Sequence, residues 1–270
     1  MKVLFCGDVV GKTGRRAVTE RMPDLRRDLD LDFVIVNGEN AAHGFGLTGA
    51  ICETFYAAGV DVVTTGNHVW SQRELINYID GDDRLLRPIN YPVGTPGRGA
   101  NLFTTRGGKR VLVINPMGRL FMEAIDDPFA AVAGALANHR LGATVDCIVV
   151  DMHAEASSEK MSMGHYFDGR VSLVVGTHTH VPTADTQVLP GGTGYQTDAG
   201  MCGDYDSIIG MEKKVAIDRF VNKMPTGRLS PADGEATLCG VYLETDDETG
   251  LAKHVASLRV GGRLAEQWPV

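Results

Sequence analysis

The sequence predicts an α/β protein in which mixed β-sheets form a sandwich with α-helices on the outside. Short β-rich apolar runs alternate along the chain with stretches of helical periodicity, which indicates βαβ units. Several of these runs are almost continuously aliphatic, as is typical of strands that are covered on both faces. Two alternating apolar and polar runs near the end of the chain add an antiparallel hairpin.

The first half of the chain is expected to supply three strands and two helices. Lys2–Cys6 is the first apolar run, and a helix is expected over 13–28. A second run at 32–36 is followed by a helix near 47–58 and a third run at 61–65. This order of strand and helix predicts crossover connections between neighbouring strands.

The second half of the chain continues the alternation and then changes character. Further strands are expected at Arg110–Ile114, 145–150 and 171–175. The runs Ala236–Thr245 and Ala252–Val260 alternate apolar and polar residues around a turn-forming segment, which predicts the hairpin.

Composition predicts one domain over residues 1–270. Hydrophobic residues make up 43% of the chain, enough to bury a sizeable core. The segment 81–99 is rich in Gly, Pro, Asn and Arg without periodicity, so a long loop or small excursion at the rim is expected there. A homo-oligomer is compatible with this composition.

Nothing in the sequence predicts a membrane partner or a secretory route. No run approaches the roughly 18–20 apolar residues of a membrane span, and the first residues lack the pattern of a signal peptide. The five cysteines are scattered without a CxxC pair. We therefore expect a reduced, cytoplasmic protein.

The net charge argues against an extended nucleic-acid surface. The chain has 34 acidic and 26 basic residues, which give a net charge of −8.

Polar side chains gather at the ends of five apolar runs. They comprise one aspartate, one glutamate, two asparagines and four histidines: Asp8, Glu39, Asn40, Asn67, His68, His153, His178 and His180. Because ligand sites in open α/β sheets form outside the carboxyl ends of the strands, we expect these side chains to lie together. Taken singly, each has an ordinary explanation, such as a helix cap for Asp8 or Asn67. Five coincidences of residue type and position weaken that explanation.

These side chains are of the types that bind transition metals. Imidazole nitrogens mixed with carboxylate and amide oxygens suit Fe, Mn or Zn. Eight such groups are too many for one ion but suit two ions that share a carboxylate. Two-metal sites stabilise the attacking and leaving oxygens of an in-line displacement at phosphorus. The residues therefore predict metal-dependent hydrolysis of a phosphate ester.

The order of the motifs resembles that of the calcineurin-like metallophosphoesterases, whose fold is an α/β sandwich. The motifs are Gly7-Asp8, Gly66-Asn67-His68, the lone His153 and Gly176-Thr177-His178-Thr179-His180. The fuller segments FCGDVVGKTGR, NGENAAHGFGLT, TTGNHVW, DMHAEASSEK and GTHTHVPTAD resemble the bacterial YmdB-like phosphodiesterases, which act on 2′,3′-cyclic nucleotides and similar phosphodiesters. The resemblance spans residues 3–203 and depends on the order of the motifs.

Two positions depart from the wider superfamily and agree with the YmdB-like branch. Val10 stands where a histidine is usual, and Glu39 stands where the bridging carboxylate is usually aspartate. The resemblance implies that Asn40 takes the vacant coordination position. It implies one metal held by Asp8, Glu39, Asn40 and His180, and a second held by the bridging Glu39 with Asn67, His153 and His178.

The resemblance also implies the chemistry of the site. A hydroxide bridging two divalent ions, Fe or Mn with Zn as an alternative, would attack the phosphorus of a small phosphodiester such as a cyclic nucleotide. His68, beside a ligand but not itself one, would protonate the departing ribose oxygen. Alternatively, His68 has no role in proton transfer and only packs beneath the metals.

Two phosphate-binding patterns in the sequence are poor matches. The segment 44–49 fits G-x-G-x-x-G, but polar residues separate it from the preceding strand, so its glycines are expected to shape a tight loop near the metals. Gly11-Lys12-Thr13 lacks the first glycine of a P-loop, because Cys6 occupies that position. Two further expectations concern residues outside these motifs. Asp198 is expected to be either a partner of a ligating histidine or a turn residue. Lys213, Lys214 and Arg219 are expected to form a solvated helix face.

Two other functions remain open from the sequence. One is a phosphomonoesterase or nucleotidase on the same scaffold. The other is a regulatory protein that binds a nucleotide or an RNA-linked partner and uses the metals structurally. The charge of −8 fits a small substrate in either enzyme, because two divalent ions would add positive charge at one point.

Overall fold

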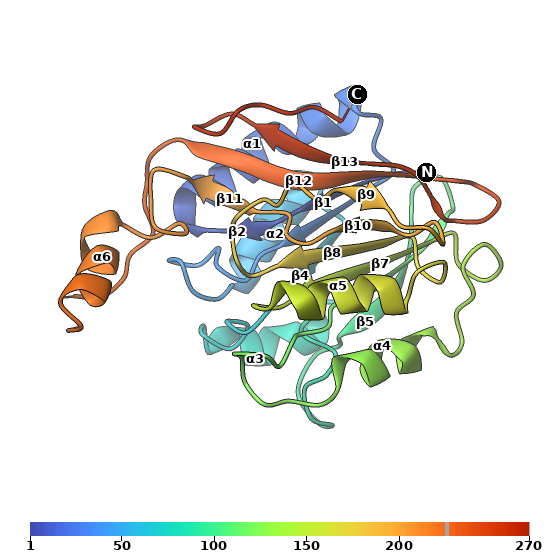
Figure 1. Ribbon diagram of the computed structural model, residues 1–270, viewed down its shortest axis with the longest axis horizontal. Helices are drawn as coiled ribbons and strands as arrows, with labels where there is room; N and C mark the ends of the chain where they lie inside the picture. The colour runs from blue at the N-terminus through green and yellow to red at the C-terminus, as the bar shows by residue number, and fades with distance from the viewer. Residues whose placement is uncertain (225–226, 270) are drawn as a thin grey trace.

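The computed structural model describes residues 1–224 and 227–269, and within them two mixed β-sheets pack face to face (Figure 1). Helices lie on the outer faces of both sheets. The predicted α/β sandwich is therefore confirmed.

The first sheet joins the two ends of the chain. Its strand order is β2-β11-β12-β1-β3-β4, with β13 paired to β12. The bounds of its strands are Lys2–Cys6 (β1), Asp8–Val9 (β2), Phe33–Asn37 (β3), Val62–Thr64 (β4), Met201–Asp204 (β11), Ala236–Thr245 (β12) and Ala252–Val260 (β13). β1, β3 and β4 are parallel, whereas β12 is antiparallel to both β1 and β13. The predicted hairpin is thus confirmed.

The second sheet has a parallel centre and antiparallel edges. Its order is β5-β6-β7-β8-β10-β9, with bounds Ala100–Thr104 (β5), Arg110–Ile114 (β6), Cys147–His153 (β7), Leu173–Thr177 (β8), Gln187–Val188 (β9) and Gly194–Gln196 (β10). The strands from β6 to β10 along this order run parallel, and β5 and β9 run antiparallel to their neighbours.

The helices cover the outer faces. Their bounds are Gly11–Asp28 (α1), Gly49–Ala57 (α2), Glu74–Tyr78 (α3), Pro128–Leu136 (α4), Ser157–Tyr166 (α5) and Lys213–Val221 (α6), with a 3₁₀ turn at Ile79–Gly81 (η1). Side chains of α1 and α2 pack against the first sheet, and those of α4 and α5 against the second. α6 projects away from the sandwich (Figure 1). Among the described residues, no helix is both long enough and apolar enough to span a bilayer.

Strand β1 shows why the apolar runs are continuous. Val3 and Phe5 face the core between the sheets, while Leu4 and Cys6 face the core under α1. Both faces of the strand are therefore removed from water, and each fully buried large side chain stabilises the fold by roughly 1.5–3 kcal/mol.

Several strand boundaries lie further toward the carboxyl terminus than predicted. The run at 145–150 becomes β7, and the run at 171–175 becomes β8. The parallel ladder between them continues as far as the pair His153 and Thr177. As a result Asp151 and His153 lie inside β7 instead of following it. The helix expected over 47–58 begins at Gly49, since the Thr48 hydroxyl accepts a hydrogen bond from the Ile51 N–H.

Some elements have too little sequence pattern to be predicted. α4 is mostly apolar and shows no clear stripe, although the Asp127 carboxylate caps it by accepting the N–H of Phe129 at 2.8 Å. β9 and β11 contain only two and four residues. The expected loop at 81–99 is held by buried Leu85 and Leu86 and by Arg87, whose guanidinium donates to four backbone carbonyls.

Candidate metal centre

The eight predicted site residues converge at one edge of the sandwich, although they come from both sheets. Asp8 lies in β2 and His153 is the last residue of β7, while the others lie in the loops that follow β3, β4 and β8: Glu39, Asn40, Asn67, His68, His178 and His180. The sheets are joined directly beneath them, because the Asp151 carboxylate of β7 accepts hydrogen bonds from Asn37 and Thr64 of the first sheet.

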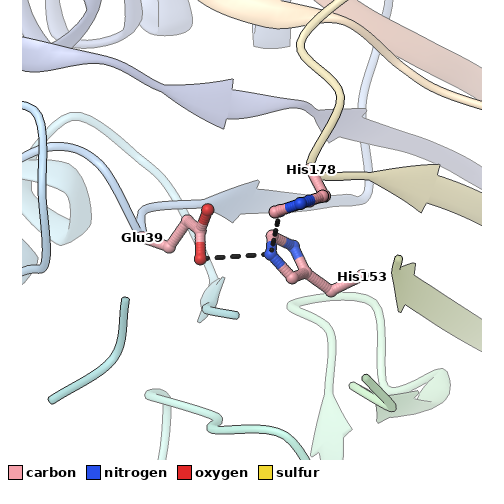
Figure 2. A group of neighbouring side chains, drawn as sticks. All are labelled: Glu39, His153 and His178. Carbon is pink, nitrogen blue, oxygen red and sulfur yellow. Dashed lines mark hydrogen bonds and ion pairs between the residues drawn. The ribbon is translucent and has the colours of Figure 1, made fainter. Parts of the chain in front are cut away.

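Two overlapping groups of side chains have the composition and spacing of metal sites. In each group the candidate ligand atoms all lie within 4.8 Å of one another; the groups are Glu39, His153 and His178, and Asp8, Glu39 and His180. Figure 2 shows the first group, in which His153 Nε2 lies 3.2 Å from Glu39 Oε2 and 3.1 Å from His178 Nδ1. Glu39 belongs to both groups, which is the position a bridging carboxylate requires.

The two asparagines divide between the groups. Asn67 Oδ1 lies 2.9 Å from His153 Nε2, beside the first group. Asn40 Nδ2 lies 3.1 Å from His180 Nε2, beside the second group. The structure thus brings all seven predicted ligands together, and their division between two ions stays a prediction.

Two buried oxygens of this cluster have no hydrogen-bond partner. They are Asp8 Oδ1 and Asn40 Oδ1, in side chains that are almost completely buried. Leaving a buried acceptor unpaired costs about 1–3 kcal/mol, and more when it is charged. Cations bound by this cluster would satisfy such oxygens. Together with the imidazole and carboxylate donors around them, these residues fit a pair of metal ions.

Hydrogen bonds to Nδ1, on the side of the ring away from the cluster, fix the orientation of His153 and His180. Thr177 donates its hydroxyl proton to Asp151 at 2.7 Å, so its oxygen accepts from His153 Nδ1 at 2.9 Å. His180 Nδ1 lies 2.7 Å from the Ile209 carbonyl, which can only accept. In both rings Nδ1 therefore donates a proton away from the cluster, and Nε2 is the nitrogen directed toward it.

His178 is oriented in the opposite way. Its Nε2 lies 3.3 Å from Glu155 Oε2, and its Nδ1 faces His153. The Glu155 carboxylate is half-exposed at the edge of the site. His178 thus presents Nδ1 inward, where its partner atoms allow it to act as a ligand.

The buried charges of the cluster perturb one another strongly. Burial raises the pKa of Asp8 to about 7. Burial alone would lower the pKa of His153, but the Glu39 carboxylate raises it to about 9. Burial would raise the pKa of Glu39, but the charge and hydrogen bond of His153 hold it well below its usual range. Burial, followed by the charge of His153, lowers the pKa of His178 to about 3. A neutral His178 is the form that can donate a lone pair to a metal.

His68 lies in the same cavity without joining either group. Its backbone N–H donates to Glu39 Oε2 at 3.2 Å, and its ring packs edge-on against Phe45 with centroids 5.0 Å apart. The ring lines a cavity of about 300 Å³ together with Glu39, His178 and His180. Burial lowers the pKa of His68. The structure thus places this imidazole beside the candidate metal ligands and open to a bound molecule.

The loop that carries His178 and His180 has an unusual backbone. Their φ angles are 93° and 66°, in the left-handed region that side chains other than glycine rarely adopt. Because β8 ends at Thr177, the two histidines lie in a loop and do not alternate along a surface strand.

Asp198 holds this loop in place. Its carboxylate accepts hydrogen bonds from the backbone N–H and hydroxyl of Thr179, at 3.1 and 2.7 Å, and from the N–H of Gly200 at 2.8 Å. It also pairs with Lys160 Nζ at 2.7 Å, and both side chains are fully buried. Of the two roles expected for Asp198, the turn role fits these contacts, since its partners are Thr179, Gly200 and Lys160.

Replacing Asp198 with Ala is expected to destabilise the protein by about 3–5 kcal/mol, because Lys160 would remain buried without its partner. The variant should also bind metal more weakly, since Thr179 would lose its anchor. The matched control is Asp206→Ala, which removes an exposed pair with Lys213 and should cost less than about 1 kcal/mol. Urea unfolding of both variants measures the difference; equal losses would contradict this role.

Sequence reasoning missed the groups that orient the histidines. Thr177 and Ile209 act through a hydroxyl and a backbone carbonyl, which carry no motif of their own. Asp151 could have been noticed, because a carboxylate inside an aliphatic strand is unusual. The expectation for the segment 44–49 is confirmed: Gly44 and Gly46 have φ angles of 87° and 85° and shape a turn whose Phe45 lines the cavity.

Comparison with known proteins agrees with this geometry. Residues 4–258 match the family described as YmdB-like protein. A 2′,3′-cyclic-nucleotide 2′-phosphodiesterase of Bacillus subtilis (strain 168) is 45% identical over 260 residues, which cover 96% of this chain and 97% of that relative.

Two solved structures have the same fold over nearly their full length. A protein from Thermus thermophilus superposes with a TM-score of 0.90 at 42% identity, covering 97% of this chain and 100% of the other. A phosphatase from Mycoplasma pneumoniae superposes with a TM-score of 0.89 at 32% identity, covering 97% and 93%. With a family match over most of its length and close relatives of equal length, the chain belongs to the YmdB-like protein family.

Proposed function

We propose that this protein is a dinuclear metal-dependent phosphodiesterase that hydrolyses 2′,3′-cyclic nucleotides and related small phosphodiesters. The observation that carries the proposal is the pair of ligand groups that share Glu39 and leave Asp8 Oδ1 and Asn40 Oδ1 unpaired. The substrate class is supported by the name of the Bacillus subtilis relative.

In this proposal the seven ligands hold two ions, Fe or Mn with Zn as an alternative. One ion is held by Asp8, Glu39, Asn40 and His180, and the other by Glu39, Asn67, His153 and His178. When bound, two such ions supply a hydroxide nucleophile near neutral pH and neutralise the charge of the phosphate oxygens.

His68 acts as the general acid. Its ring lines the cavity beside Glu39, and its backbone is fixed there by the hydrogen bond to the Glu39 carboxylate. His68 Nδ1 lies 3.4 Å from the Ser71 hydroxyl, so Nε2 is the nitrogen that can hold a proton for the ribose oxygen that leaves phosphorus. Proton donation to a leaving group is typically worth about 10²–10⁴-fold in rate. The packing of Phe45 against the ring limits its rotation.

The lining of the cavity favours a diester over a monoester. Among the described residues that line it there is neither lysine nor arginine, and Glu155 adds a carboxylate at its edge. A phosphomonoester carries more negative charge than a diester and would need more cationic groups around it. We therefore expect kcat/KM for 2′,3′-cyclic AMP to exceed that for 3′-AMP by at least about 100-fold. Steady-state assays on one metal-loaded preparation measure both; a preference for 3′-AMP would identify a nucleotidase instead.

We also propose a cytoplasmic location and self-association. All five cysteines are free and buried, which suits a reducing compartment. Self-association is supported by a stripe of exposed apolar residues at helical spacing on and just after α6. Its members are Ile217, Phe220, Val221 and Met224, which are 45%, 72%, 73% and 63% exposed. Pairing of this stripe with the same stripe of a second copy would remove it from water. A monomeric mass by light scattering at micromolar concentration would contradict the self-association.

A further inference from the structure

The lining of the metal cavity includes several apolar residues. Besides the candidate ligands and His68, the cavity is lined by Phe45, Ile209, Met211 and Leu229, called here the apolar wall. Met211 is buried in a small cluster against which Phe45 and Leu229 pack as partly exposed side chains. Phe45 packs against the His68 ring and the Ile209 carbonyl accepts from His180, but neither contact uses the side chains of Ile209, Met211 or Leu229. A bound molecule would be in contact with it while its phosphate lies at the ligands.

Ile209, one residue of this wall, has an unfavourable backbone conformation. Its φ of 47° is left-handed, which is unfavourable for a β-branched residue. Its backbone carbonyl is needed by His180, but Asn or Gly would supply that carbonyl with less strain. Ile209 is nevertheless 53% exposed and lines the cavity. A β-branched apolar residue kept in a strained conformation at the lining of a site indicates that its side chain is used.

The apolar wall leads into a second hollow that is more polar. Phe45 and Leu229 line both the metal cavity and this hollow of about 730 Å³. The hollow is lined in addition by His43, Ser71, Arg228 and Ser230. A molecule that extends from the ligands would therefore meet first an apolar surface and then hydrogen-bonding groups.

We propose that the apolar wall binds the nucleobase of the substrate, with the edge of the base directed to the polar hollow. This inference rests on the proposed cyclic-nucleotide activity. A nucleobase has apolar faces and a polar edge, which matches this order of surfaces. Stacking on apolar and aromatic side chains accepts any base, because every base has a π-face. The wall thus selects nucleoside cyclic phosphates over other cyclic phosphates without strong preference among bases.

The test compares a cyclic diester that carries a nucleobase with one that has neither base nor ribose ring. The ratio of kcat/KM for 2′,3′-cyclic AMP to that for glycerol 1,2-cyclic phosphate is measured on the same metal-loaded preparation, so the ratio does not depend on the active fraction. Leu229→Ala and Ile209→Asn, which removes the apolar side chain but tolerates a left-handed backbone, are each expected to lower the ratio about fivefold, mainly through KM. The control Leu102→Ala, on edge strand β5, should leave the ratio unchanged.

A second readout is independent of turnover. Calorimetric binding of adenosine, which carries no phosphate, to chelator-treated protein should weaken about fivefold in Leu229→Ala and Ile209→Asn and not in Leu102→Ala. Unchanged ratios and affinities in both wall variants would overturn the base site while leaving the proposed phosphodiesterase intact. If the wild-type protein hydrolysed neither diester, the proposed function itself would fail, which is a different result.

Discussion

Glu39→Gln is expected to abolish catalysis by removing the one carboxylate that both ligand groups share. The neutral amide would be a much weaker ligand for two cations at once, and Glu39 is nearly fully buried, so no other group can take its place. We expect less than one ion per chain after reconstitution and a fall in kcat/KM of at least about 10⁴-fold. Elemental analysis and turnover of 2′,3′-cyclic AMP measure the two quantities.

The matched control for this variant is Glu20→Gln, which changes an exposed carboxylate paired with Arg16 on α1. Its metal content and turnover should equal those of the wild type. If Glu39→Gln bound both ions at wild-type affinity and kept its activity, Glu39 would not be the bridge.

His68→Ala is expected to separate metal binding from catalysis. The ring belongs to neither ligand group, so the variant should keep two ions per chain. Without the proton donor, kcat should fall about 10²–10⁴-fold while KM changes little. An ester with a good leaving group, such as bis-p-nitrophenyl phosphate, needs less help from an acid and should lose less activity than 2′,3′-cyclic AMP.

His165→Ala, an exposed histidine on α5, is the control for the loss of an imidazole and should behave as the wild type. Loss of metal from His68→Ala comparable to that from Asn67→Ala would instead make His68 a ligand or a structural residue. Equal losses of activity with both esters would also contradict the acid role, because a ligand or packing defect does not depend on the leaving group.

The sequence predicted the layered fold because its strongest signals are long and continuous. The aliphatic run of β1 and the alternating runs of β12 and β13 determine their own pairing through burial. The same reasoning failed for α4 and β11, which are short and depend on contacts made elsewhere in the chain. Such elements form because of their tertiary neighbours and not because of local propensity.

For the site, the sequence predicted which residues meet but not how they are held. Asp8 and His180 are far apart in the chain, and they were connected by the rule that ligand sites form at strand ends and by the order of the family's motifs. The orientation of His180 depends on the Ile209 carbonyl, and the loop that presents it depends on the buried pair of Asp198 and Lys160. These contacts arise from backbone geometry in three dimensions, and no spacing of residue types encodes them.

The claim that two metal ions at this centre serve catalysis is tested most directly by titrating Mn²⁺ or Fe²⁺ into chelator-treated wild-type protein. Bound metal and turnover of 2′,3′-cyclic AMP are followed on the same samples. We predict that turnover is absent without metal and reaches its maximum at about two bound ions per chain. A protein that carries two ions per chain yet hydrolyses no phosphodiester at any pH would contradict the account, and its metals would then be structural, as in a regulatory binding protein.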